Sequence, residues 1–292
     1  MVSEKCLFIW AIRPAYKVRS QAQDAGIEQK DTYFIVLRFV VLGSSSSGNA
    51  LLVFTEETRV LVDNGFSFKR LSQTLGLVGI PPETLNAVVV THEHADHVKG
   101  IGVLARQTGM SVFMTHGCAK ALPEYVGHIP NLHCFESGDM LRFNDIEAVS
   151  FAVSHDAADP VNYIFRSGGA KLGMATDCGH YSQLTRARLS GSNALVIEAN
   201  YCPDMLRHGP YPPQVQQRIH SRMGHLSNID VQQMLGELKH DALKLVVLTH
   251  ISRDNNTPEL ACRLAREVLH NLPIQVTAAP ADGPSPVFEV LP

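Results

Sequence analysis

The most reactive stretch of the chain follows the apolar run Val88–Val90, where five ionisable side chains lie within six residues: His92, Glu93, His94, Asp96 and His97. An apolar β-branched run bounded by polar residues is typical of a buried strand, and binding sites are commonly built where such strands end. His92 and His94 are two residues apart, so both imidazoles project to the same side of an extended segment. Imidazole and carboxylate are ligands of zinc, manganese and iron. The cluster therefore predicts a metal site, and a merely solvated polar loop is the weaker interpretation.

Four later apolar segments repeat this arrangement, since each ends in a ligand-type residue. The expected strands 149–153, 171–176, 194–197 and 243–248 lead to His155, Asp177, Glu198 and His250, respectively. A single strand end of this kind would be weak support, but the repetition indicates that these side chains converge with the first cluster. Asp63 likewise ends an expected strand, residues 60–62.

The composition is that of an ordinary globular protein. The chain has 292 residues, 45% of them hydrophobic, which is enough for one large domain or two small ones. A net charge of -3 argues against a broad surface that coats nucleic acid, although a local basic groove stays possible. No apolar run approaches the roughly 18 residues that a membrane helix needs. Six scattered cysteines without a C-x-x-C pair favour a reducing compartment, so we expect a cytoplasmic protein.

The domain organisation changes near residue 34. We expect residues 1–33 to form a loosely ordered extension and residues 34–292 to form the functional domain, because regular strand and helix patterns begin at Phe34. The Gly/Ser-rich segment 43–49 reads as a turn. Its backbone N–H groups could hold an anion, and a plain tight turn is an equally good interpretation.

The motif in Thr91–His97 resembles a known family. It matches the H-x-H-x-D-H pattern of the metallo-β-lactamase superfamily, and the later strand-end residues follow in the order of that family. Segments 154–161, 224–228 and 252–260 resemble the YycJ/WalJ subfamily of bacterial 5′-to-3′ DNA exonucleases, which are similar to ribonuclease J. The resemblance covers about residues 37–292. It implies an α/β fold in four αββα layers, with two mixed sheets face to face.

Site roles follow from this resemblance position by position. It implies two divalent metal ions, zinc or manganese, with His92, His94 and His155 on the first, Asp96, His97 and His250 on the second, and Asp177 bridging both. Asp63 would orient a ligand imidazole. In-line phosphoryl displacement by a two-metal-activated hydroxide would use Asp96 to accept a proton. His225, in a glycine-flanked loop, is the candidate general acid, with a capping or core role as the alternative.

We therefore expect a metallo-hydrolase, and most specifically an exonuclease acting on DNA with a 5′-phosphate. The candidate substrate contacts are Ser46, Ser47, Asn49, Arg253 and Asn255. Alternatives are a hydrolase of the same fold acting on RNA, a thioester or a lactam, and a non-catalytic metal-binding module. The complete ligand set argues against the module, because structural sites leave no open coordination position. The sequence does not fix the metal or the oligomeric state.

Overall fold

Two seven-stranded mixed sheets face each other in the computed structural model, which describes residues 35–292. The extension expected at residues 1–33 lies outside the described residues. The first sheet contains, in spatial order, β14 (Phe288–Val290), β1 (Leu37–Ser45), β2 (Gly48–Phe54), β3 (Arg59–Val62), β4 (Ala87–Val89), β5 (Ser111–Thr115) and β6 (Leu132–Phe135). The second contains β13 (Gln275–Ala278), β12 (Leu245–Thr249), β11 (Ala194–Glu198), β10 (Ala170–Ala175), β9 (Val161–Ser167), β8 (Ile146–Ala152) and β7 (Met140–Phe143).

The two sheets have the same pairing pattern. In the first, strands from β14 through β3 pair antiparallel and strands from β3 through β6 pair parallel. In the second, β7 through β10 pair antiparallel and β10 through β13 pair parallel. The C-terminal strand β14 completes the first sheet beside β1, with Val290 opposite Leu37.

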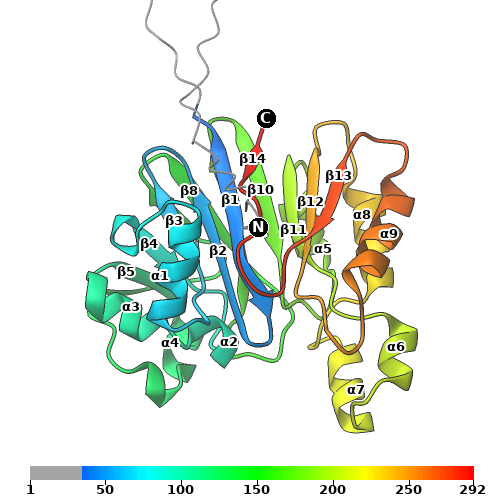
Figure 1. Cartoon of the computed structure of the whole chain (residues 1–292), viewed down its shortest axis with the longest axis horizontal. Coiled ribbons are helices and arrows are strands. Elements are labelled where there is room, and N and C mark those ends of the chain that lie inside the picture. Colours follow the sequence, from blue (N-terminus) through cyan, green and yellow to red (C-terminus); the bar gives the residue numbers. More distant parts are fainter. Residues whose placement is uncertain (1–34) are drawn as a thin grey trace, which may run out of the picture.

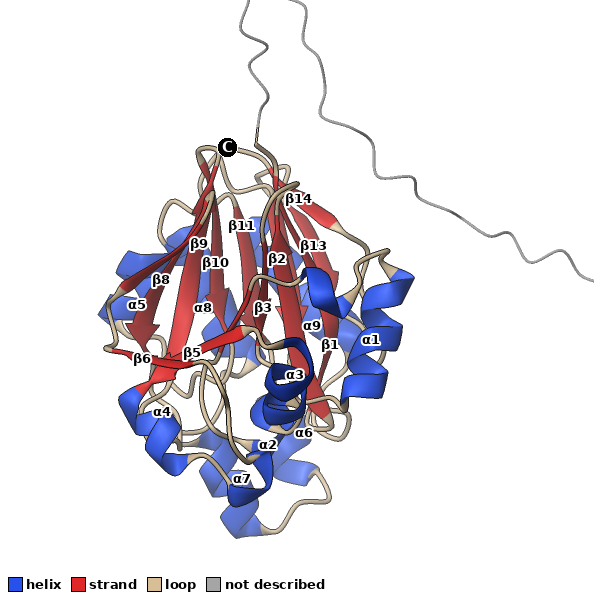
Figure 2. Ribbon diagram, turned by 90° about the vertical axis from the view of Figure 1, so that its left-hand side faces the viewer, coloured by secondary structure: helices blue, strands red, loops and turns tan. Residues whose placement is uncertain are grey.

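Helices cover the outer face of each sheet, which confirms the expected αββα sandwich. Figure 1 shows α1 and α3 beside the first sheet and α8 and α9 beside the second, and Figure 2 shows the sandwich after a quarter turn. The helices are α1 (Phe68–Leu77), α2 (Ala95–Val98), α3 (Ile101–Thr108), α4 (His116–Ala121), α5 (Gln183–Leu189), α6 (Pro203–His208), α7 (Pro213–His220), α8 (Asn228–Leu238) and α9 (Pro258–Leu269), with short 3₁₀ turns η1 (Pro82–Thr84) and η2 (Glu124–Val126). Among the described residues, no helix combines the length and the apolar character needed to cross a bilayer.

Strand alternation produces three apolar layers. In β1, Phe39 and Val41 pack between the sheets, whereas Val40 and Leu42 pack under the helices of the first sheet. Successive side chains of a strand point to opposite faces, so a strand covered on both sides must be apolar throughout. A third layer, which includes Val246 and Leu248 of β12, lies between the second sheet and its helices. This construction leaves the strand ends as the places where polar side chains gather.

Two local predictions were wrong in detail. Segment 43–49 is mostly paired strand, with Ser45 opposite Gly48, so the turn is reduced to Ser46 and Ser47. The glycines serve packing instead, because a Cβ on Gly48 would lie 2.5 Å from the Phe66 ring. The sequence also predicts a helix over residues 98–108 that ends at Gly109. In the structure this helix begins later, at Ile101, after the separate short helix α2, and its predicted end is confirmed by the left-handed φ of 68° at Gly109. Ser227 caps α8, in a capping box with Asp230.

Candidate metal centre

One edge of the sandwich collects polar side chains from both sheets. The segment after β4 supplies the histidine cluster and α2, and β3 ends directly before Asp63. In the second sheet, β10 and β12 lead to Asp177 and His250, and Glu198 is the last residue of β11. The prediction that strand ends bring these residues together is therefore confirmed for this edge.

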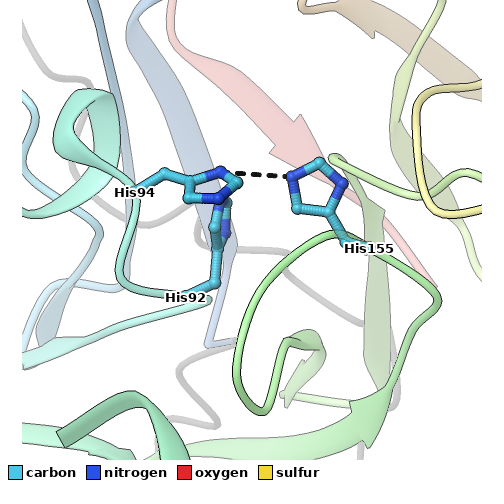
Figure 3. Close-up of side chains that lie close together, drawn as sticks. All are labelled: His92, His94 and His155. Atoms are coloured by element: carbon cyan, nitrogen blue, oxygen red, sulfur yellow. Dashed lines mark hydrogen bonds between the residues drawn. The ribbon is translucent and has the colours of Figure 1, made fainter. Parts of the chain in front are cut away.

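Three imidazoles form the first group, as Figure 3 shows. Ligand atoms of His92, His94 and His155 all lie within 4.8 Å of one another, and Nδ1 of His94 is 3.3 Å from Nε2 of His155. Nε2 of His94 donates to the carbonyl of Asp156 at 2.8 Å, and Nδ1 of His155 donates to the carbonyl of Gly224 at 3.0 Å. A carbonyl only accepts, so each of these contacts fixes a tautomer and leaves the other ring nitrogen free to bind a cation.

A second group surrounds His97. Its Nδ1 donates to Asp63 at 2.8 Å, while its Nε2 lies 3.5 Å from Asp96 and 3.4 Å from Asp177. The amide of Asn49 donates to Asp96 at 2.9 Å and lies 3.1 Å from Nε2 of His97. Asp63 thus contacts the His97 ring through Nδ1, and its second oxygen accepts the backbone N–H of Thr91 at 2.8 Å.

The third group comes from the second sheet. Nδ1 of His250 lies 3.0 Å from Asp177 and 3.4 Å from Glu198, and Nδ1 of His225 lies 3.0 Å from Glu198. Glu198 has no exposed surface. It also accepts backbone N–H groups from Cys178 at 2.9 Å and from Leu226 at 2.8 Å. Its carboxylate therefore ties two loops of the centre to the end of β11.

The charges at this edge are strongly coupled. Burial alone would lower the pKa of His97, but Asp177 and Asp63 raise it well above its usual range. Burial would also lower the pKa of His250, but Asp177 and Glu198 raise it to about 10. Burial would raise the pKa of Asp177, yet His250 and His97 hold it well below its usual range. For His92, burial and the charge of His97 both lower the pKa. Metal ligands bind deprotonated, so a cation that enters this centre must displace protons from His97 and His250.

The donor set fits divalent cations. Nε2 of His92 and Oδ2 of Asp177 are buried and have no hydrogen-bond partner within residues 35–292. Buried polar atoms without partners are rare because they are costly, so two of them directed into one cluster indicate that a bound group satisfies them. Mixed imidazole and carboxylate donors suit zinc or manganese.

Backbone strain marks three of these residues. Asp63, Asp177 and His250 have φ values of 58°, 51° and 50°, in the left-handed region that side chains other than glycine seldom adopt. Each follows a strand of the sandwich and turns its side chain toward the centre. Strain of this kind persists only where surrounding contacts hold it, and it concentrates at functional sites.

Comparison with known proteins identifies the family. Residues 58–251 match the family described as "Beta-lactamase superfamily domain". The chain is 40% identical over 235 residues to exodeoxyribonuclease YycJ of Bacillus anthracis, which covers 80% of this chain and 89% of that protein. It is 36% identical over 231 residues to exodeoxyribonuclease WalJ of Streptococcus pneumoniae, which covers 78% and 86%, respectively. The chain belongs to the metallo-β-lactamase superfamily, in the YycJ/WalJ subfamily.

A solved structure agrees with this assignment at the level of the fold. The metallo-β-lactamase fold protein YhfI from Bacillus subtilis aligns with a TM-score of 0.67 and 17% identity, over 87% of this chain and 99% of that one. The family and the fold predicted from the H-x-H-x-D-H motif are thus both confirmed.

The predicted substrate contacts differ in exposure and in their distance from the centre. Ser46 and Ser47 are exposed at the tip of the β1–β2 hairpin, and Asn49 lies inside the centre, against Asp96. Arg253 is exposed and pairs with Asp282 at 2.6 Å. Asn255 has no exposed surface, and its amide lies 3.4 Å from Ser252. Its side chain is enclosed within its own loop, so a substrate contact at Asn255 stays a prediction that would require this loop to open.

Sequence reasoning gave Glu198 no role, although it noted its place at a strand end. The residue type was the one signal in the sequence. A carboxylate directly after the apolar run Leu195–Ile197 must accept several hydrogen bonds if it is buried. Which donors it meets depends on loops at residues 177–178 and 225–226, and no local pattern predicts that convergence.

Proposed function

We propose that this chain is a metal-dependent phosphodiesterase that degrades DNA from the 5′ end. The observation that carries the proposal is the convergence of seven predicted ligands at one edge of a fold shared with proteins named exodeoxyribonucleases. The similarity covers 89% of YycJ and 86% of WalJ, so it spans nearly the whole of each relative. The seven residues are His92, His94, Asp96, His97, His155, Asp177 and His250.

Two cations, zinc or manganese, would be held by groups of the donors described above. His92, His94 and His155 suit one ion, and Asp96, His97 and His250 suit the other, with Asp177 near both groups. Bound there, divalent ions would supply Lewis-acid polarisation of a phosphoryl oxygen and a water that loses its proton near neutral pH.

The protein itself would manage the protons. Asp96 lies in the first turn of α2 with one oxygen fixed by Asn49, so its carboxylate is positioned to accept a proton from the attacking water. His225 presents Nδ1 to Glu198, and a carboxylate holds the proton on that nitrogen. In the imidazolium form Nε2 also carries a proton, which it can give to the departing sugar oxygen, and the ring is then left neutral with its remaining proton on Nδ1. His225 is partly exposed, as a group that meets substrate must be.

The 5′ terminus needs an anion site beside this centre. An exonuclease removes a fixed unit from an end, so the end must be bound at a set distance from the reacting phosphate. Ser46 and Ser47 at the hairpin tip, with Arg253 after His250, are our candidates for that contact. Asn49 anchors the same hairpin to Asp96, which would couple the end site to the reacting groups.

The test uses oligonucleotides labelled at the 3′ end, with either a 5′-phosphate or a 5′-hydroxyl, in DNA and RNA versions, with Mn²⁺ or Zn²⁺. We expect shortening of DNA from the 5′ end, and faster for the 5′-phosphate. Equal rates for the 5′-phosphate and the 5′-hydroxyl oligonucleotides would remove the end site from the proposal. Shortening from the 3′ end, or hydrolysis of thioesters or lactams in place of DNA, would overturn it.

A further inference from the structure

A row of charged side chains crosses the outer face of the second sheet, at the end away from the metal centre. Strand register places Arg142 opposite Glu147, Glu147 opposite Arg166, and Arg166 opposite Lys171, on the adjacent strands β7 to β10. Neighbours such as Phe165 pack between the sheets, so the alternating side chains of the row point outward. Adjacent strands are about 4.8 Å apart, which makes the row about 14 Å long.

This row lies in a groove of about 640 Å³. Gly168, Gly169 and Gly191 form part of its lining, so no side chains narrow it at those positions. Helix α5 covers the neighbouring part of the same face but ends at Leu189. The corner of the sheet beyond that helix end is where the row is accessible.

The groove is lined by more cations than carboxylates, namely Arg142, Arg166 and Lys171 against Asp145 and Glu147. Glu147 pairs with Arg142 at 3.1 Å, and Asp145 accepts a hydrogen bond from the hydroxyl of Thr58. Within residues 35–292, no carboxylate forms an ion pair with Arg166 or Lys171. The Lys171 ammonium donates to the carbonyl of Ser190 instead. Burial, together with the charges of Arg166 and Arg188, lowers the pKa of Lys171 to about 8, as expected for a crowded cation without a counter-ion.

We propose that this groove binds the phosphate backbone of a nucleic acid strand, as a second contact site remote from the metal centre. The choice of nucleic acid rests on the proposed nuclease function. A single small anion would meet one or two cations, whereas a DNA strand carries one charge per about 3.4 Å and could engage a 14 Å row along its length. Guanidinium groups match phosphate geometry well, and two of the three cations are arginines.

The distance between the two sites makes the proposal specific. Lys171 lies near the start of β10, and Asp177 follows six residues later, just after the strand ends. An extended segment of that length spans roughly 20 Å, which is the separation between the groove and the metal centre. At about 3.4 Å per nucleotide, a strand held at the centre must extend at least about six nucleotides to reach the groove. Long strands should therefore use the groove, and very short ones should not.

The experiment measures binding of fluorescent single-stranded DNA of 30 and 4 nucleotides to the full chain, without metal and in a chelator, so that nothing is cleaved. We expect the double variant Arg166→Gln/Lys171→Gln to bind the 30-nucleotide strand about tenfold more weakly. Its dependence of affinity on salt should be shallower by roughly 1–2 units of log–log slope, since two phosphate contacts are lost. Binding of the 4-nucleotide strand should not change.

Two controls separate charge from folding and from general surface charge. Arg166→Lys/Lys171→Arg keeps both charges and should bind like the wild type, while Lys239→Gln/Arg263→Gln removes two exposed cations of the α8–α9 region and should also have no effect. Wild-type affinity in Arg166→Gln/Lys171→Gln would overturn the proposal, as would equal weakening for both strand lengths. Pyrophosphate is the small-anion probe: groove-dependent binding of pyrophosphate without an effect on DNA would assign the groove to a small phosphate ligand. Groove-dependent DNA binding by a protein that cleaves no DNA would keep this site and reject the nuclease.

Discussion

Two buried carboxylates support the metal centre from opposite sheets, and they do so in different ways. Asp63, after β3, accepts the backbone N–H of Thr91 at 2.8 Å and its hydroxyl at 2.7 Å, together with Nδ1 of His97 at 2.8 Å. Glu198, at the end of β11, accepts from the loop at Cys178 and from the loop that contains His225 and Leu226. Asp63 orders one short segment, whereas Glu198 joins segments that are far apart in the sequence.

The difference indicates that the two halves of the centre depend on the fold to different degrees. In the first sheet, four ligands lie within six residues, so one correctly formed strand end places most of them. In the second, His155, Asp177 and His250 come from three separate strands. We therefore expect the loss of Glu198 to destabilise its half of the centre more than the loss of Asp63 destabilises the other half. The substitutions below test that ranking.

Glu198→Gln should have the largest effect. The amide would turn a donor toward other donors, leaving buried N–H groups and His225 without their acceptor. Breaking a buried charged pair typically costs about 3–5 kcal/mol. We expect the free energy of unfolding of the metal-free protein to fall by about that amount, and the cleavage rate to fall at least about 100-fold. Denaturant titration and DNA cleavage measure the two effects.

His225→Ala is the matched control for this substitution. If Glu198 affects cleavage only through His225, the double variant Glu198→Gln/His225→Ala should cleave no more slowly than His225→Ala alone. Its stability should still fall, because the backbone donors at Cys178 and Leu226 lose their acceptor in either background. Wild-type stability in Glu198→Gln would contradict the joining role.

Asp63→Asn should have an intermediate effect, concentrated on the metal. Residues that orient ligand imidazoles typically contribute about 10–100-fold to metal affinity. We therefore expect a loss of that size, measured by competition with a chelator, and a decrease in stability of about 1–3 kcal/mol. A larger loss of stability than in Glu198→Gln would reverse the comparison between the two halves.

Ser44→Ala should have the smallest effect, although it connects the sheets. The Ser44 hydroxyl of β1 accepts the backbone N–H of His250 at 2.7 Å. Removing it leaves one buried N–H unpaired, so we expect a loss of about 1 kcal/mol in thermal or chemical denaturation. Ser45→Ala is the matched control, since among the described residues the Ser45 hydroxyl accepts only the backbone N–H of Ser47, in its own turn, at 3.3 Å. Equal losses in the two variants would show that the contact between sheets has no special weight.

Much of the fold and the centre could be predicted because the signals are local. The buried run before His92 and the strand ends before Asp177 and His250 are read from apolar stretches and the polar residues that follow them. The role of Glu198, the burial of Asn255 and the pairing of Arg253 with Asp282 depend on contacts between distant segments. The glycines of segment 43–49 were misread for the same reason, since their partner is Phe66.

The left-handed residues carry an evolutionary consequence. Glycine at position 63, 177 or 250 would relax a backbone that costs an aspartate or a histidine about 1 kcal/mol or more to adopt. Such a change would remove a carboxylate or an imidazole from the centre at the same time. The hydrogen bonds lost at position 63 are alone expected to cost about 1–3 kcal/mol, which offsets the relief, so glycine brings no gain in stability there. Selection on stability and selection on chemistry therefore both keep a strained aspartate at this position, and drift toward glycine is opposed twice.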